Sequence, residues 1–119
     1  MARRAYHQQM LRTVTELGVN LTEASSIHDL IGAAYGVDGL ILHESDLAPE
    51  FLNLKTGLLG ELFQKLINYR LPTAVIIPDF DAHGERFSEL AREHTKHPQV
   101  RFFSSESEGR AWLEKIAGS

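Results

Sequence analysis

Two continuous apolar runs, one on each side of a strongly amphipathic segment, constrain the fold of this chain most. The runs at 40–43 and 73–77 lack the apolar–polar alternation of a half-exposed strand, so we expect each to be a strand covered on both faces. Through about 56–69 the apolar residues recur at helical spacing, which predicts a helix with one broad apolar stripe. That stripe consists of Leu58, Leu59, Leu62, Phe63, Leu66 and Ile67. A strand, a helix and a strand in this order are typical of an α/β domain.

The N-terminal part of the sequence extends this alternation. Residues 9–15 alternate between apolar or β-branched and polar side chains, which predicts a half-buried strand. We expect Thr22 to cap a helix over about 23–35. The apolar face of this helix carries Ile27, Leu30, Ile31 and Ala34. The segment 1–8 is short and polar, and we expect it to be either disordered or a short edge strand.

The C-terminal part predicts two more helices around one short strand. A helix over about 83–94 buries Phe87, Leu90 and Ala91, and the strand covers 100–103. Ser105 with Glu108 forms a capping box, which opens a last helix carrying Ala111, Trp112 and Ile116. Strand and helix therefore alternate four times. This order predicts a single α/β domain over 1–119, with a sheet of four to five strands and helices packed against it.

Composition excludes several classes of protein. The chain has no cysteine, which rules out disulfides, a thiol nucleophile and cysteine-ligated zinc. A net charge of −4 argues against nucleic-acid binding, because contacts to phosphates need clustered Lys and Arg. No apolar run approaches the length of a membrane span, and the N-terminus lacks the apolar stretch of a signal peptide. We therefore expect a cytoplasmic protein without a metal or a cofactor.

The junction between the first buried strand and the amphipathic helix is the candidate site. His43 and Glu44 end the strand, and Lys55 and Thr56 lie at the predicted start of the helix. A hydroxyl, an ammonium and unpaired backbone N–H groups are thus expected at one exposed place, which favours an anion or a partner. The alternative for Thr56 is a plain helix cap. That alternative leaves Lys55 unexplained, because a cation near a helix N-terminus opposes the helix dipole.

Two glycines near this junction lie off the apolar stripe. Gly57 and Gly60 each weaken a helix interior by about 1 kcal/mol relative to alanine, so a close backbone contact or a partner protein is expected there. Glu61 follows directly and completes the predicted partner surface. With His43 and Glu44, Glu61 also suggests an acid–base or metal cluster, but no His pair has ligand spacing. Salt bridging or capping by Glu44 is the simpler expectation.

One block of the sequence resembles a known family. The run from His43 through Pro49, Asn53 and 55–57 to Lys65 resembles the signature of the bacterial family called domain of unknown function 4180. The element order and the turn before the helix are also similar, more distantly, to STAS domains, which are anti-sigma-factor antagonists. That resemblance implies a STAS-like fold with a mixed sheet of four to five strands. It also implies a hydroxyl that a partner kinase phosphorylates, which falls here on Thr56. Asn53 stands where STAS domains usually have Asp.

These observations predict a non-enzymatic regulatory or protein-binding module that uses residues 43–61. Its expected binding residues are His43, Glu44, Asn53, Lys55, Thr56, Gly57, Gly60 and Glu61. A protein partner or self-association is expected. One alternative is a small-molecule or lipid-binding domain with an enclosed cavity lined by Phe51, Phe63 and Phe87. The other is a small enzyme that uses His43, Glu44 and Lys55, which requires these side chains to converge on one pocket.

Overall fold

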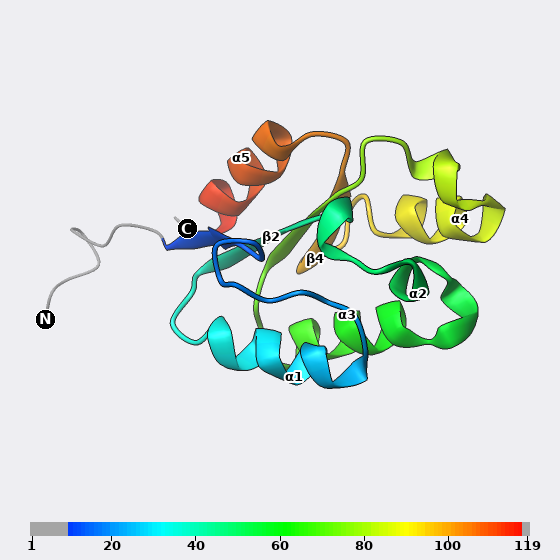
Figure 1. Cartoon of the computed structure of the whole chain (residues 1–119). Coiled ribbons are helices and arrows are strands. Elements are labelled where there is room, and N and C mark those ends of the chain that lie inside the picture. Colours follow the sequence, from blue (N-terminus) through cyan, green and yellow to red (C-terminus); the bar gives the residue numbers. More distant parts are fainter. Residues whose placement is uncertain (1–9, 118–119) are drawn as a thin grey trace, which may run out of the picture.

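A computed structural model describes residues 10–117, and the predicted disorder or edge strand at 1–8 lies outside this part (Figure 1). Strands and helices alternate along the chain, with short helical turns in the loops. The strands are β1 (Leu11–Thr13), β2 (Gly39–His43), β3 (Thr73–Ile76) and β4 (Val100–Phe103). The α-helices are α1 (Ala24–Ala33), α2 (Pro49–Leu52), α3 (Leu58–Asn68), α4 (Glu85–Glu93) and α5 (Glu106–Ala117). The 3-10 turns are η2 (Glu44–Asp46), η3 (Leu54–Thr56) and η4 (Phe80–His83).

The described strands form one sheet in the order β1-β2-β3-β4. All three pairings are parallel, with Ile41 opposite Ala74 and Val75 opposite Phe102 in the register. The prediction of an α/β domain with a sheet of four to five strands is confirmed, with four strands among the described residues. The predicted mixed sheet is not found among the described strands, because every crossover helix returns the chain to the same end of the sheet.

Helices cover both faces of the sheet, so its strands are buried (Figure 1). Leu40, Leu42 and Val75 face the larger core, which is shared with α1, α3 and α4. Ile41 and Ala74 face a smaller core under α5. This alternation explains why 40–43 and 73–77 read as continuous apolar runs, since each face of these strands needs apolar side chains.

Helix α3 buries the predicted stripe through Leu59, Leu62, Phe63 and Leu66. It begins two residues later than predicted, because residues 49–56 form the separate turns α2 and η3. The predicted cap of α1 is also wrong. Glu23, not Thr22, is the N-cap residue, and it forms a reciprocal capping box with Ser26.

Helix α5 packs against the sheet with close contact to β3. It begins after Ser105, whose hydroxyl oxygen accepts a hydrogen bond from the Glu108 N–H, as the capping box predicted. A Cβ atom built on Gly109 would lie 2.9 Å from the Cβ of Ala74 and 2.8 Å from Cδ1 of Ile76. Glycine at this position therefore allows the helix to rest directly on β3.

Candidate functional site

The loops after the carboxyl ends of the parallel strands bring together most of the polar residues that the sequence singled out. In open α/β sheets this edge is where ligands usually bind. His43 ends β2 and extends the face formed by Ile41, so its side chain reaches α5. Glu44 starts the next turn and reaches the loop after β3. His43 and Glu44, although adjacent in the sequence, therefore contact different elements at this edge of the sheet.

His43 lies between two carboxylates. Its Nε2 atom is 2.7 Å from Oε1 of Glu106, and its Nδ1 atom is 3.8 Å from Oδ2 of Asp46. Glu106 also accepts a 2.6 Å hydrogen bond from Nε of Arg110. The hydrogen bonds from Arg110 and then from His43 hold the pKa of Glu106 below its usual range. With both ring nitrogens facing protein carboxylates, His43 ties β2 to α5.

Asp46 joins several segments of this part of the chain, although sequence analysis did not single it out. Its Oδ2 atom accepts a 2.8 Å hydrogen bond from the His43 N–H. Its Oδ1 atom accepts a 2.8 Å hydrogen bond from the Thr15 hydroxyl, which follows β1. Asp46 therefore joins the loops after β1 and β2. The 31-residue separation from Thr15 explains why local patterns missed it.

Glu44 pairs with His83 at the end of η4. The carboxylate bonds Nε2 of His83, whose ring packs against Phe87 at a centroid separation of 5.0 Å. Glu44 thus has a side-chain hydrogen-bond partner, in keeping with the expectation of capping or salt bridging, although sequence analysis did not name His83. Asp79 and Asp81, at the start of the same loop, are turn residues, because Asp79 accepts a hydrogen bond from the Asp81 N–H.

The loop before α3 is held by its own side chains. Asn53 accepts a 3.1 Å hydrogen bond from the Lys55 N–H. The Thr56 hydroxyl lies 2.7 Å from the carbonyl oxygen of Glu50 and 2.9 Å from that of Asn53, and it accepts a hydrogen bond from the Leu58 N–H. Thr56 thus has the contacts of a cap, although the residue is exposed.

Gly57 and Gly60 have different environments. Gly57 has a φ of 77°, which L side chains rarely adopt, and this conformation turns the chain into α3. Gly60 has ordinary backbone angles and lies in open space, with no described atom within 4 Å of a built Cβ. Glu61 is likewise exposed. The prediction of a close backbone contact is therefore wrong within the described residues, and a partner at Gly60 stays a prediction.

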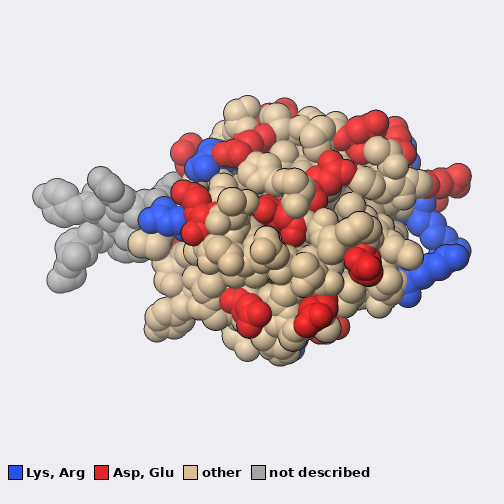
Figure 2. Space-filling view, viewed as in Figure 1, with Lys and Arg blue, Asp and Glu red and all other residues tan. Residues whose placement is uncertain are grey.

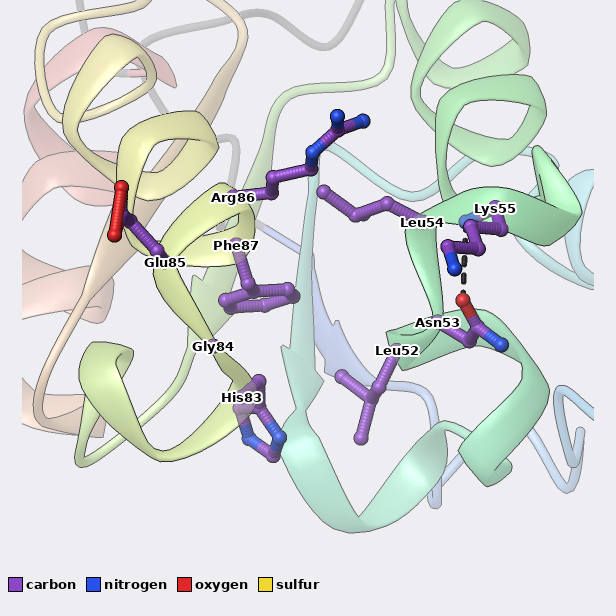
Figure 3. Close-up of a pocket in the computed structure, with 9 residues that line it drawn as sticks. All are labelled: Leu52, Asn53, Leu54, Lys55, His83, Gly84, Glu85, Arg86 and Phe87. Atoms are coloured by element: carbon purple, nitrogen blue, oxygen red, sulfur yellow. Dashed lines mark hydrogen bonds between the residues drawn. The ribbon is translucent and has the colours of Figure 1, made fainter.

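A cleft of about 380 Å³ separates the loop before α3 from the start of α4 (Figure 3). Leu52, Asn53, Leu54 and Lys55 form one wall. The other wall is formed by His83, Gly84, Glu85, Arg86 and Phe87. The rings of His83 and Phe87 face Leu52 across the gap, Arg86 extends toward Leu54, and Glu85 points away (Figure 3).

The cleft combines apolar walls with exposed cations. Lys55 and Arg86 form no ion pair with any residue among 10–117. Gly84, the N-cap residue of α4, provides no side-chain cap, so the first N–H groups of this helix add positive potential to the same wall. Figure 2 shows that basic side chains lie mainly at the two ends of the face in view, one of them the end that carries α4. Of the charged residues that line the cleft, Lys55 and Arg86 are basic, and the acidic Glu85 points away from it.

The three residues of the enzyme hypothesis do not line one pocket. His43 and Glu44 line a separate hollow of about 200 Å³ with Ser45, Ile76 and Pro78, whereas Lys55 lines the cleft. The aromatic residues of the lipid-binding alternative are also separated. Phe51 and Phe63 are buried in the core, and Phe87 alone among these three lines the cleft.

Comparison with known proteins identifies the family. Residues 7–113 match the family described as Domain of unknown function (DUF4180). The chain belongs to this family. No significant match to a curated protein or to a solved structure was found, so the predicted relationship to STAS domains has no support.

Within the described part of this DUF4180 chain, no three His, Asp or Glu side chains are arranged to hold a metal ion. No helix among residues 10–117 has the length and apolar character that crossing a bilayer requires.

Proposed function

We propose that the protein is a non-enzymatic binding module whose cleft between 52–55 and 83–87 takes a small anion with an apolar body. The observation that carries this proposal is the placement of Lys55 and Arg86, which form no ion pair among residues 10–117, on opposite walls of a cleft that Leu52, Leu54 and Phe87 also line. The volume of about 380 Å³ lies within the usual range for small-molecule sites. The proposal keeps part of the predicted 43–61 surface and combines it with the start of α4.

The cationic groups and the apolar side chains of the cleft favour different parts of a ligand. Lys55, Arg86 and the uncapped start of α4 favour a carboxylate or a phosphate. Leu52, Leu54 and Phe87 favour an aliphatic or aromatic body. A fully hydrated ion would leave these apolar walls in water, and a neutral apolar molecule would leave the cations unused. An amphipathic anion matches both.

The polar pairs beside the cleft support binding more than catalysis. Glu44 and His83 bond each other, and His43 faces Glu106 and Asp46, so these groups hold loops together. The Glu44–His83 pair also fixes the ring of His83 in the cleft wall. A preorganised wall reduces the loss of conformational freedom when a ligand binds.

Calorimetric titration with straight-chain carboxylates from butanoate to octanoate tests this proposal. Each buried methylene contributes about 0.8 kcal/mol, so affinity should rise about fourfold per methylene until the cleft is full. Lys55→Ala and Arg86→Ala should each weaken octanoate binding about tenfold, or about 1.4 kcal/mol. Lys65→Ala removes a cation of α3 outside the cleft and should bind like the wild type. Equal affinity along the series, or equal losses in all three variants, would refute the proposal.

A further inference from the structure

Strand β4 forms one edge of the described sheet, and its outward backbone groups do not face another strand. The carbonyl oxygens of Gln99 and Phe103 accept hydrogen bonds from β3 and the residue after it. Because alternate residues of a strand point their backbone groups in opposite directions, Val100 and Phe102 direct theirs away from the sheet. Such groups need other partners or invite pairing with another chain.

The turn between α4 and β4 supplies these partners. Nδ1 of His97 accepts hydrogen bonds from the N–H groups of Gln99 and Val100, both at 3.1 Å. Nδ1 of His94 lies 2.9 Å from the carbonyl oxygen of Val100, and the backbone oxygen of His94 accepts from the Phe102 N–H at 3.2 Å. Residues 94–97 therefore cover the free edge; we call them the edge cap.

The two histidines have opposite hydrogen-bonding roles. The Val100 carbonyl only accepts, so Nδ1 of His94 carries a proton, and this bond persists when the His94 ring becomes charged. The N–H groups of Gln99 and Val100 only donate, so Nδ1 of His97 must be unprotonated. A proton on that atom would point at two donors and break both hydrogen bonds.

We propose that the edge cap is sensitive to protons, and that it keeps all four of its hydrogen bonds to residues 99–102 only while His97 is neutral. The charged form of His97 leaves the N–H groups of Gln99 and Val100 to water. Nothing in this step depends on the cleft or on its ligand.

The surroundings of His97 oppose its charged form. Among the described residues, the titratable and charged groups that face it are His94, whose ring stacks on it at 4.8 Å, and Arg101, whose Nε donates to its carbonyl oxygen. Burial first, and then these two neighbours, lower the pKa of His97 below its ordinary value of 6.5. The two hydrogen bonds to His97 are therefore present at neutral pH and are lost as acidification charges the ring.

The turn also holds an unsatisfied polar atom. Oε1 of Gln99 is buried and has no hydrogen-bond partner among the described residues. A buried acceptor without a partner is unfavourable, so the loss of the two hydrogen bonds to His97 adds to a cost that this turn already carries.

Nuclear magnetic resonance on the full chain between pH 8 and pH 5 tests the proposal. Nitrogen-15 shifts of the neutral His97 ring should show an unprotonated Nδ1. As the ring titrates, the protection factor of the Val100 amide against hydrogen exchange should fall at least tenfold. A neutral ring with its proton on Nδ1, a ring that stays neutral down to pH 5, or unchanged protection through the titration would each overturn the proposal.

Two substitutions separate the proton effect from loss of the ring. The side-chain oxygen in His97→Asn can accept from the N–H groups two and three residues on without titrating, so protection of the Val100 amide should persist at both pH values. His97→Ala removes the acceptor, and protection should be low at both. His28→Ala removes an exposed histidine of α1 and should leave the wild-type behaviour unchanged. A pH-dependent loss of protection in His97→Asn equal to that of the wild type would contradict the assignment.

Discussion

Replacing each of two helical glycines by alanine tests how closely α5 packs on the sheet. A Cβ at Gly109 would lie 2.9 Å from the Cβ of Ala74, which can move only with β3, and 2.8 Å from Cδ1 of Ile76. A Cβ at Gly60 would meet no described atom within 4 Å. Both residues lie inside helices, so the gain in helix propensity is similar at the two positions, about 1 kcal/mol.

The difference between the two variants isolates the packing cost. Inserting a carbon atom into a close-packed contact typically costs about 1–3 kcal/mol. Gly60→Ala should therefore stabilise the protein by about 0.5–1 kcal/mol, and Gly109→Ala should be about 1–3 kcal/mol less stable than Gly60→Ala. Ile76 can rotate away, but Ala74 cannot, so part of the cost must remain.

Urea unfolding followed by circular dichroism measures this difference directly. The slope of the unfolding free energy with urea should be the same for both variants, which keeps the comparison in one unfolding regime. Equal stabilities of Gly60→Ala and Gly109→Ala would refute the close approach of α5 to β3. A destabilised Gly60→Ala would instead show that Gly60 has an internal contact.

Three further changes test the loop before α3, the site beside α5 and the predicted partner surface. Thr56→Ala should lower stability by about 1 kcal/mol, because it removes the acceptor for the Leu58 N–H, and thermal unfolding measures this loss; no loss would contradict the capping geometry. The lowered pKa of Glu106 means that its stabilising contribution is complete above about pH 4.5 and is lost as the pH falls through the folded-state value. Glu106→Gln should therefore reduce the acid-induced fall of the urea midpoint, and an unchanged acid response would count against the bonds to His43 and Arg110. If the exposed Gly60 faces a partner or a second copy, Gly60→Leu should weaken association in sedimentation experiments while the fold stays stable; persistence of every measured association would place the interface elsewhere.

Helical and strand periodicity predicted most of the secondary structure, because burial of one or two faces leaves a direct trace in the sequence. Leu59, Leu62 and Leu66 repeat at the spacing of one helix face, and they are buried. Boundaries were less predictable. Helix α3 begins later than predicted, because the αL conformation of Gly57 and the hydroxyl of Thr56 end a separate turn before it.

The glycines show the limit of local reasoning. Gly60 drew attention because it lies off the apolar stripe, yet the space around it is open. Gly109 drew none, although it has the close contact with β3. The difference depends on a neighbouring strand more than thirty residues away in sequence, and no spacing rule within a helix reports it.

Sequence analysis singled out only one wall of the cleft, because the other wall comes from a distant part of the chain. Lys55 was singled out because it opposes the helix dipole, and the structure places it on the wall of the cleft. Arg86 and His83 complete that cleft from a different crossover. In the sequence, these two residues lie near the start of a charged helix, which is a common pattern. Their place in the cleft becomes apparent only from the packing of α4 beside the loop before α3.

A map of the amide shifts caused by octanoate tests the proposed binding site most directly. We predict that titration of the nitrogen-15-labelled full chain will shift the amides of Leu54, Lys55, Arg86 and Phe87 in a saturable way. The amides of α5, on the opposite face of the sheet, should stay in place. Saturable shifts confined to residues outside 52–55 and 83–87, or no saturable shifts with any carboxylate of the series, would contradict the account.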